Sequence, residues 1–314
     1  MKILITGACG YVGTMLTNQL VSDGHSVIAL DTQWFGNALE EKDNLQIIKQ
    51  DIRDIDHVPL DNIGVVIHLA NIANDPSVEL NPTLSWEVNV LASQQLADRC
   101  ISAGVKHLIY ASSGSVYGLK EEEKVTEDLS LVPISVYNKT KMVSERIFLS
   151  YKDNLSIHCI RPATVCGFSE RMRLDLSVNM LTAQAIKNKR ITVFGGTQVR
   201  PNINIRDMVR VYQHFIANRD IPSGCYNAGF ENISILDIAQ LVKDKIPSKI
   251  IITESNDPRS YRLCSEKLEQ TGFERSYSVE DAINDMIEKF ESGEILDTPQ
   301  CYTVEWMKTL NLHQ

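Results

Sequence analysis

Short apolar runs rich in branched residues alternate with amphipathic segments through the first half of the chain. The apolar runs lie at residues 2–6, 26–30, 45–49, 64–69, 106–111 and 155–161. Helical patterns lie near residues 12–23, 86–103 and 136–151. Near-continuous apolar strands that alternate with helices are typical of a parallel sheet covered on both faces. The pattern therefore predicts an α/β fold with a doubly wound parallel sheet.

The pattern changes after Arg161 and Pro162. Further helical patterns near residues 174–188, 206–218, 234–246 and 279–291 are separated by turns that contain glycine and proline. We therefore predict a first domain at residues 1–165 and a smaller mixed α/β lobe at residues 166–314, with some segments of the second half returning to the first domain. No flexible linker separates the two parts, so we expect them to pack closely.

Composition and charge narrow the classes of protein to which this chain can belong. The 314 residues are 43% hydrophobic and 23% charged, with a formal net charge of −9, which argues against nucleic acid or an anionic membrane as the main partner. The seven cysteines form no CxxC pair and no cluster at zinc spacing, so we expect no metal site and a reducing compartment. No room for a signal peptide precedes the first strand, and no apolar run approaches the length of a membrane span. We expect a cytoplasmic protein.

A glycine-rich loop follows the first strand directly and opens the first helix. Gly7, Gly10 and Gly13 are spaced GxxGxxG, and Tyr11 and Val12 lie between the last two. Glycine lets a backbone approach a pyrophosphate, and the N-terminus of a helix offers free N–H groups and a positive dipole end. The loop predicts a dinucleotide site in a Rossmann fold.

The second strand closes on Asp31, about 20 residues after the loop. A carboxylate at this place can accept hydrogen bonds from both ribose hydroxyls of an adenosine. Residues 32–37 contain no Lys or Arg that could neutralise a 2′-phosphate. The cofactor is therefore predicted to be NAD rather than NADP.

The third and fourth predicted strands end beside the same site. Asp51 and Ile52 follow the third strand and are expected to border the adenine. The residues expected at the cofactor edge after the fourth strand are Leu69, Ala70 and Asn71. His68 precedes them and has no evident catalytic partner, so we interpret it as a packing residue.

Three further residues predict hydride-transfer chemistry. Ser113 follows the fifth strand, and Tyr137 and Lys141 lie one turn apart at the start of the next helix. A neighbouring cation lowers the pKa of a tyrosine, and a shift from about 10 to neutrality requires about 4 kcal/mol, which an ammonium together with an oxidised nicotinamide can supply. Tyr137 is therefore a candidate general base.

At these positions the chain resembles the extended short-chain dehydrogenase/reductase family, in its NAD-dependent nucleotide-sugar epimerase/dehydratase branch. The resemblance implies that Ser113 hydrogen-bonds the reacting sugar hydroxyl and that Tyr137 is the acid/base. Lys141 would hold the nicotinamide ribose and tune Tyr137. Asn89 resembles the asparagine that supports the site, and Arg161 opens a stretch that lines the nicotinamide.

The chain also departs from the family pattern. Cys166 stands where tyrosine is usual and Phe168 where proline is usual, which concerns the shape of the sugar pocket rather than the hydride chemistry. We interpret Cys166 as a small buried hydrophobe rather than a catalytic thiol. The family's dehydratases carry an Asp-Glu pair after the catalytic Ser/Thr, whereas this chain has Gly114 and Ser115. Without an acid to protonate a leaving hydroxyl, dehydration is not expected.

Arginines are concentrated in the second half of this acidic chain, at Arg171, Arg173, Arg200, Arg206, Arg210, Arg259 and Arg262. Guanidinium groups bind phosphate in a bidentate manner, whereas Arg206, Arg210 and Arg262 could equally be solvated surface charges. By resemblance, Asn179, Arg200 and Arg259 are candidate ligands of a nucleoside diphosphate. Residues 169–176 resemble a subgroup that acts on UDP- or GDP-linked sugars of bacterial surface polysaccharides.

The sequence thus predicts a nucleotide-sugar epimerase that inverts C4 through a transient ketone. One alternative is a 4-dehydrogenase or ketoreductase with net redox chemistry, and another is a non-catalytic dinucleotide-binding protein. Resemblance also implies a homodimer built on the helices near residues 86–103 and 136–151. Val90, Met142 and Phe148 are expected to face outward there.

Overall fold

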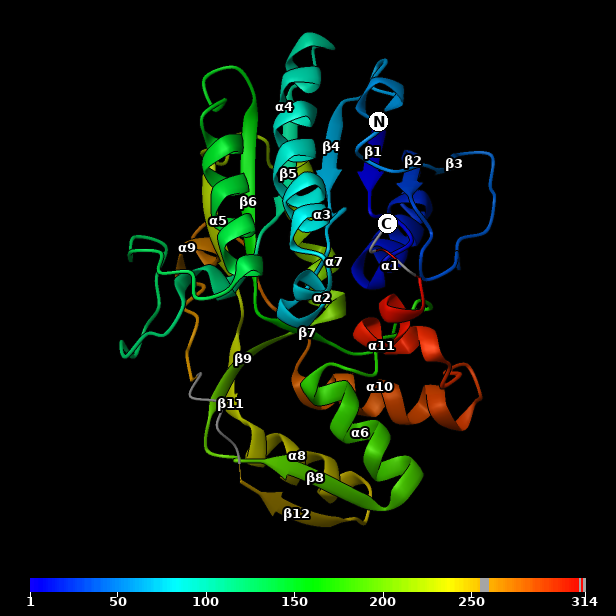
Figure 1. The fold of residues 1–314 in the computed structure, drawn as a ribbon, viewed down its shortest axis with the longest axis vertical. Coiled ribbons are helices and arrows are strands. Elements are labelled where there is room, and N and C mark those ends of the chain that lie inside the picture. The colour runs from blue at the N-terminus through cyan, green and yellow to red at the C-terminus, as the bar shows by residue number, and fades with distance from the viewer. Residues whose placement is uncertain (255–259, 311, 313–314) are drawn as a thin grey trace.

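A seven-stranded sheet forms the core of the larger part of the molecule in this computed structural model (Figure 1), which describes residues 1–254, 260–310 and 312. Its strands are β1 (Lys2–Thr6), β2 (Ser26–Asp31), β3 (Leu45–Lys49), β4 (Val65–His68), β5 (His107–Ala111), β6 (Ser156–Pro162) and β10 (Gly224–Ala228). They lie in the order β10-β6-β5-β4-β1-β2-β3, and all neighbours are parallel. The predicted doubly wound fold is confirmed, and the six predicted strands differ from the observed ones by one residue or less at either end.

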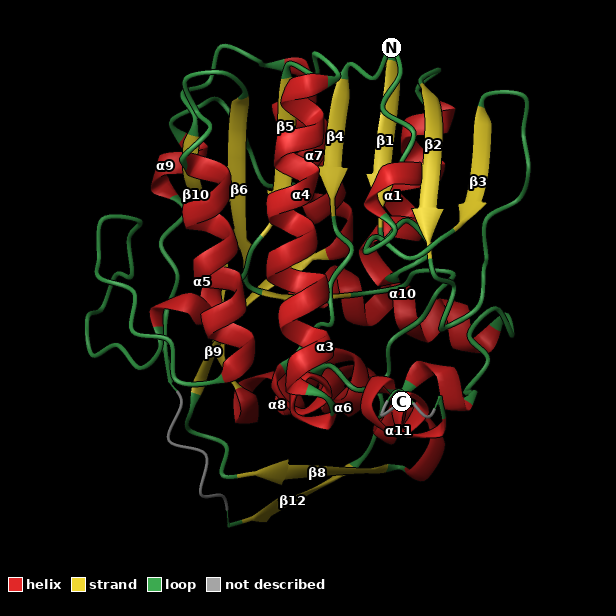
Figure 2. Cartoon of the chain, turned by 45° about the horizontal axis from the view of Figure 1, so that its top comes forward, coloured by secondary structure: helices red, strands yellow, loops and turns green. Residues whose placement is uncertain are grey.

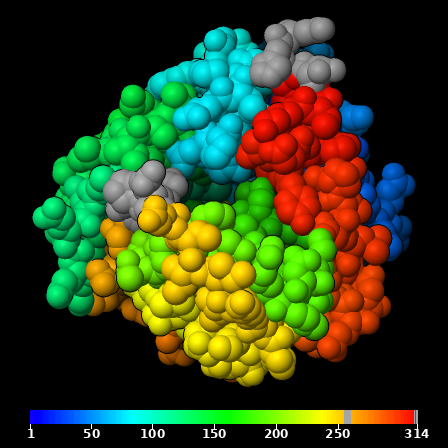
Figure 3. Space-filling view, turned by 60° about the horizontal axis from the view of Figure 1, so that its bottom comes forward, coloured from blue at the N-terminus to red at the C-terminus, as the bar shows by residue number. Residues whose placement is uncertain are grey.

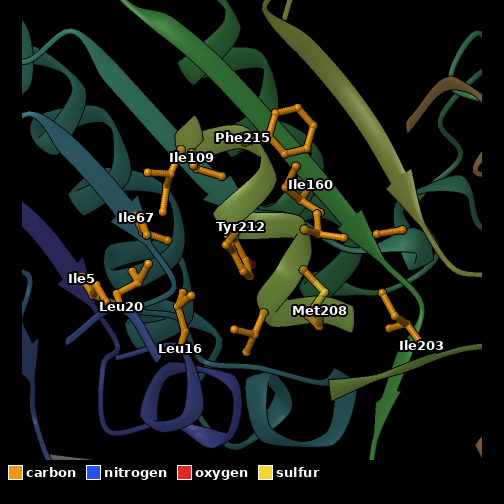
Figure 4. Packing of buried hydrophobic residues seen from close by; sticks show 14 of the residues in the cluster. Ile5, Leu16, Leu20, Ile67, Ile109, Ile160, Ile203, Met208, Tyr212 and Phe215 are labelled. Atoms are coloured by element: carbon orange, nitrogen blue, oxygen red, sulfur yellow. The ribbon is translucent and has the colours of Figure 1, made fainter. Parts of the chain in front are cut away.

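Helices cover both faces of this sheet because alternate strand residues point to opposite sides. Ile3 and Ile5 pack on the face covered by α1 (Tyr11–Ser22) and α7 (Ile205–Ala217), as Figure 4 shows for Ile5. Leu4 packs on the opposite face, which α4 (Ala92–Ser102) and α5 (Val136–Leu149) cover (Figure 2). Two buried layers therefore hold the carboxyl ends of the strands at fixed positions.

The helix predicted near residues 86–103 is not one continuous α-helix. The chain forms α2 (Asp75–Leu80) and α3 (Pro82–Trp86), then a π-helical turn at Glu87–Leu91, and only then α4. The π-helical turn carries Asn89, whose side chain accepts a hydrogen bond from Ile72 N at 2.8 Å and donates one to Ile72 O at 3.2 Å. A π-turn commonly marks a functional constraint within a helix, and this tertiary contact is invisible to helical periodicity.

The prediction that Phe148 faces outward is wrong. Its side chain is fully buried, and its ring lies 4.8 Å from the Tyr110 ring and 5.7 Å from the His68 ring. Helix α5 packs its Phe148 face on β4 and β5, so this aromatic belongs to the core. Met142 and Val90 are partly buried.

The smaller part of the molecule holds a separate apolar core. Its elements are β7 (Thr164–Cys166), α6 (Ser177–Asn188), β8 (Arg190–Phe194), β9 (Val199–Asn204), β11 (Glu231–Ser234), α8 (Ile235–Lys245), β12 (Lys249–Thr253) and α10 (Val279–Glu291). Two short helices from the same half of the chain pack on the larger part instead: α9 (Glu266–Glu269) lies against β10, and α11 (Thr303–Thr309) lies against α2. A mixed sheet of β11-β9-β7 and a parallel pair β12-β8 belong to the smaller part. Between these segments, α7 and β10 rejoin the large sheet. Within the described residues, no helix has the length and apolar character needed to cross a membrane.

Two buried histidines predict a stability that falls with acid. His68 is fully enclosed, and its ring nitrogens lie 2.7 Å from Thr6 Oγ1 and 3.1 Å from Ser93 Oγ. Burial lowers the pKa of His68 and of His107 to about 3. Between that value and the ordinary pKa of about 6.5, the unfolded chain binds two protons that the folded chain excludes. These two groups should therefore lower the free energy of unfolding by about 2.7 kcal/mol for each unit by which the pH is decreased near pH 5.

Urea unfolding at pH 7, 6 and 5 measures this slope. His68→Gln should remove about half of the contribution of the pair. The matched control is His57→Gln, because the exposed His57 ring pairs with Asp54 and its pKa is raised, so its loss should not flatten the slope. A His68→Gln slope equal to that of the natural protein would contradict the prediction.

Candidate active site

A cavity of about 500 Å³ opens at the carboxyl ends of the large sheet, between the two parts of the molecule. This edge is where doubly wound sheets bind their ligands. Figure 3 shows the surface recessed where the C-terminal segment (red) meets the cyan and green segments. The predicted site residues that line the cavity are Gly7, Gly10, Tyr11, Val12, Gly13, Asp31, Asp51, Ile52, Leu69, Ala70, Asn71, Ser113, Tyr137, Lys141 and Arg200.

The glycine loop is shaped for close approach of a ligand. Gly7 has φ +75°, and a Cβ there would lie 2.5 Å from Ala70 N. A Cβ on Gly13 would lie 2.2 Å from Gly7 O. Gly10 precedes α1 and has no side chain to cap its first N–H groups, so a bound anion can accept hydrogen bonds from them. This geometry fits the diphosphate of a dinucleotide.

Polar groups at the ends of β2 and β4 extend the site. Asp31 accepts hydrogen bonds from Cys9 N at 3.0 Å and Gln33 N at 2.7 Å, so the carboxylate also braces the glycine loop. Burial raises the pKa of Asp31, although these two hydrogen bonds act in the opposite direction. Both amide atoms of Asn71 are buried without a hydrogen-bond partner at the cavity wall. Such groups are costly to leave unpaired, which supports a ligand at this place.

Ser113, Tyr137 and Lys141 meet at one end of the cavity. Ser113 lies just after β5, and its Oγ lies 2.7 Å from Ser115 Oγ. Tyr137 is in the first turn of α5, which Ser135 caps through a 3.1 Å hydrogen bond from Asn138 N. Lys141 is one turn further, with its Nζ 5.8 Å from the centre of the Tyr137 ring. Two secondary-structure elements therefore bring together the three residues that the sequence predicts.

The pKa values of this group differ from the simple expectation. Burial raises the pKa of Tyr137 to about 12, although a hydrogen bond with Ser113 acts in the opposite direction. Burial also lowers the pKa of Lys141 to about 7, and its Nζ donates a 2.6 Å hydrogen bond to Ala111 O. The protein by itself does not lower the pKa of the phenol, because removal from water outweighs the hydrogen bond with Ser113 and the positive charge of Arg173.

Asn89 lies behind the site rather than on the cavity wall. Its Nδ2 donates to Thr140 Oγ1 at 3.0 Å, and its main-chain oxygen accepts a 2.6 Å hydrogen bond from Ser144 Oγ. Thr140 and Ser144 belong to α5, on either side of Lys141. Asn89 thus ties the helix that carries Tyr137 and Lys141 to the end of β4.

Arg161 and Asn179 are also not brought to the cavity. Arg161 forms a buried bidentate ion pair with Glu145, with both N–O distances at 2.8 Å, and donates to Tyr117 Oη at 2.7 Å. Asn179 is fully buried, where its side chain accepts from Gly167 N at 2.9 Å and donates to Tyr11 Oη at 3.0 Å. Their polar groups are already used within the protein. The structure gives both residues a supporting position instead of a ligand contact.

The second half of the chain completes the cavity wall. Arg200 on β9 lines it, with its guanidinium 5.9 Å from the centre of the Tyr261 ring. Arg259 lies outside the described residues. Cys166 is fully buried with its pKa raised by burial, as expected of a packing residue. The cavity is also lined by residues that the sequence does not assign to the site, namely Trp34, Phe35, Arg171, Arg173, Leu176, Tyr261, Thr303 and Met307.

The last described helix covers one side of the cavity. Thr303 and Met307 of α11 line it, and Thr303 N donates to Asp175 Oδ2 at 2.9 Å. Trp306 Nε1 donates to Trp34 O at 2.7 Å. The helix is therefore attached both to the second lobe and to the loop after β2. No motif in residues 303–309 signals this role.

Comparison with known proteins agrees with this geometry. The profile of the NAD-dependent epimerase/dehydratase family matches residues 3–229. An uncharacterized UDP-glucose epimerase of Bacillus subtilis, YtcB, is 31% identical over 261 residues, which are 78% of this chain and 82% of the relative. UDP-glucuronic acid decarboxylase 1 of Danio rerio is 27% identical over 307 residues, 92% of this chain and 72% of the relative.

A crystal structure of UDP-glucuronic acid 4-epimerase from Bacillus cereus, in complex with UDP-glucuronic acid and NAD, is similar in fold. Its TM-score is 0.80 at 26% identity, with 93% of this chain and 99% of that chain covered. NAD is the cofactor, and the glycine loop and Asp31 of this chain fit it. The resemblance read from the sequence is confirmed: the chain belongs to the NAD-dependent epimerase/dehydratase family.

Proposed function

We propose that this protein is an NAD-dependent epimerase that inverts C4 of a UDP-linked sugar through a transient ketone. The observation that carries the proposal is the convergence of Ser113, Tyr137 and Lys141 at one end of a cavity whose other end holds the glycine loop and Asp31. The names of the relatives support UDP as the nucleotide.

Each residue of this group has a role that follows from its position. Ser113 holds the C4 hydroxyl of the sugar, and Tyr137 takes up the hydroxyl proton and later returns it. Lys141 positions the nicotinamide ribose and keeps a proton donor beside the phenol. NAD held at this site would supply an acceptor for the C4 hydride and a donor that returns it to the other face of the ketone. Its positive ring would favour the phenolate of Tyr137, whose pKa the protein alone holds at about 12.

Dehydration is disfavoured by the residues beside Ser113. Gly114 and Ser115 occupy the short turn that follows it, and Ser115 Oγ is hydrogen-bonded to Ser113 itself. Neither residue can protonate a leaving hydroxyl as a carboxylic acid does. A net oxidoreductase is the alternative enzyme, because the same three residues also serve a dehydrogenase. A non-catalytic binding protein has no need of the three residues together.

We also propose Arg200 as a ligand of the substrate diphosphate, because its guanidinium lies on the wall contributed by the second lobe.

We further propose that the boundary near residue 165 separates a domain that binds NAD from a lobe that mainly binds the sugar nucleotide. All seven cysteines are free, which supports the cytoplasm as the proposed compartment.

The deciding experiment incubates the purified protein with UDP-glucose, UDP-galactose, UDP-glucuronic acid and GDP-mannose, and separates the products by chromatography. Formation of the C4 isomer without net NADH supports the proposal. Stoichiometric NADH, followed by its absorbance, indicates the net oxidoreductase. A lack of turnover with every sugar nucleotide, together with tight NAD binding, would overturn the proposed reaction.

The cofactor preference can be tested at Asp31. Asp31→Ala should weaken NAD binding by about 10- to 100-fold, because it removes a charge-assisted contact of about 1.5–3 kcal/mol. The preference for NAD over NADP should narrow, since the carboxylate no longer repels a 2′-phosphate. Titration with both nucleotides measures this, with the exposed Asp23→Ala as control. Equal binding of NAD and NADP by the natural protein would contradict the assignment of Asp31.

A homodimer remains the proposed assembly, through α4 and α5 of each subunit. The two helices pack side by side (Figure 2) and could form a four-helix interface across a two-fold axis. The exposed Trp86 and Leu91 lie at the start of the same region. Sedimentation at micromolar concentration should give a mass of about two chains, twice 35.3 kDa. A mass of one chain would exclude this assembly.

A further inference from the structure

Arg171 is a buried cation that forms no ion pair with any residue that the structure describes. The residue is only 8% exposed, its Nε is buried with no hydrogen-bond partner, and one Nη makes a single 3.4 Å hydrogen bond to Met172 O. Its guanidinium lies 4.2 Å from the centre of the Phe35 ring. Arg173, two residues away, instead pairs with Asp175 through distances of 2.8 and 3.1 Å. Among the described carboxylates, none forms an ion pair with Arg171.

The position of Arg171 is fixed by the segment that precedes it. Gly167 O accepts a 2.6 Å hydrogen bond from Tyr11 Oη, and Ser169 Oγ donates to Tyr11 O at 2.8 Å. Tyr11 is the first residue of α1, so residues 167–171 are attached to the N-terminus of that helix. Arg171 therefore lines the cavity beside the glycine loop, at the end marked by Asp31 and Phe35.

A charge in this position has an energetic consequence. Removing a guanidinium from water costs several kcal/mol unless an anion compensates for it, and burial lowers the pKa of Arg171 to about 10. Asp31 is close enough to act on Arg171 electrostatically, but its oxygens already accept from Cys9 N and Gln33 N. The uncapped first turn of α1 is a second positive site on the same wall. Both features call for a bound anion.

We propose that Arg171 binds the diphosphate of NAD together with the glycine loop. Arg171 stacks on Phe35 at the end of the cavity that carries Asp31, whereas the neighbouring Arg173 is already paired with Asp175. A residue of the second lobe then holds a cofactor that otherwise lies on the first domain. The inference rests on the NAD site and not on the sugar reaction proposed above.

The test uses full-length protein loaded with radiolabelled NAD and chased with an excess of unlabelled NAD. Arg171→Met should release NAD about 10- to 100-fold faster, because a charge-assisted contact to phosphate is lost. The matched control is Arg206→Met, since Arg206 pairs with Asp285 on α10 and does not line the cavity. Arg171→Lys, which keeps the charge but not the planar stack on Phe35, should give a smaller loss than Arg171→Met.

Competition separates a phosphate contact from a structural role. In direct titration, ADP-ribose should bind Arg171→Met about 10- to 100-fold more weakly than it binds the natural protein. The affinity for adenosine, which has no phosphate, should be the same in both proteins. Nucleotide-free Arg171→Met should unfold at the same temperature as the natural protein or a higher one, because an uncompensated buried charge has been removed. Its stabilisation by saturating NAD should be smaller.

Three results would overturn the proposal. The first is an unchanged rate of NAD release. The second is an equal loss of affinity for adenosine and for ADP-ribose, which would indicate a collapsed site. The third is a loss of affinity for UDP alone, which would assign Arg171 to the sugar nucleotide. None of these outcomes depends on epimerase turnover, so a failure of the proposed reaction would be seen separately in the product assay.

Discussion

Replacing Tyr137 with phenylalanine should lower turnover at least about 100-fold and leave NAD binding nearly unchanged. The phenol is the only proposed proton carrier at the sugar hydroxyl, and its loss removes little contact area. Turnover of the natural protein should rise with pH toward the pKa of Tyr137, because the phenolate is the active form. Residual turnover of the phenylalanine variant should lack this rise.

Steady-state kinetics on an identified sugar nucleotide, together with NAD titration, measure both quantities. Tyr151→Phe is a suitable control, because Tyr151 lies just after α5 and its hydroxyl contacts Asp98 at the surface. Near-normal turnover in Tyr137→Phe would refute the assignment. Loss of NAD binding to the same degree as turnover would show that the substitution damages the cofactor site instead.

Replacing Lys141 with methionine should reduce turnover about 100-fold and NAD affinity about 10-fold. The ammonium serves both the phenol and the nicotinamide ribose, so one change should affect both. The variant should remain folded. Because burial lowers the pKa of Lys141 from about 10.5 to about 7, the folded state carries a desolvation cost below pH 7 that declines as pH rises to 10.5. Methionine removes that cost.

Lys139→Met provides the matched control, since Lys139 is an exposed neighbour on the same helix. Its turnover and NAD affinity should equal those of the natural protein. If Lys141→Met lost turnover alone or NAD affinity alone, the two roles would not be shared by this residue. Thermal unfolding of both variants at pH 6 and pH 9 checks that each is folded and that the stability gain of Lys141→Met is larger at pH 6.

Six of the seven strands of the large sheet could be predicted from sequence, and the central ones among them are buried on both faces and therefore apolar throughout. Strand β1 shows this, as Ile3, Leu4 and Ile5 all have fully buried side chains. Strand β10, which contains a glycine and an asparagine, was not predicted. The π-helical turn at Glu87–Leu91 could not be predicted, because it depends on the contact of Asn89 with Ile72, which is distant in sequence. Phe148 was misplaced because periodicity shows that a helix has an apolar side without showing what covers it.

The candidate site shows the same contrast between features that can be predicted from sequence and features that cannot. Residues carried by short motifs at strand ends, such as Gly7 and Ser113, were located because a parallel sheet brings its carboxyl ends to one edge. Phe35, Arg171 and Met307 come from segments far apart in the chain, and only packing of the second lobe brings them together. Asn179 matched a ligand pattern, but its amide is used to join Tyr11 to Gly167.

The attachment of α11 has a practical consequence for producing this protein. Trp306 and Leu312 fasten the C-terminal segment to Trp34 and Asn81, beside the cavity. Met1 is half exposed at the amino end of β1, at the opposite edge of the sheet from the cavity (Figure 1). An affinity tag should therefore be placed before Met1, because a fusion after α11 would be joined to the wall of the cofactor cavity.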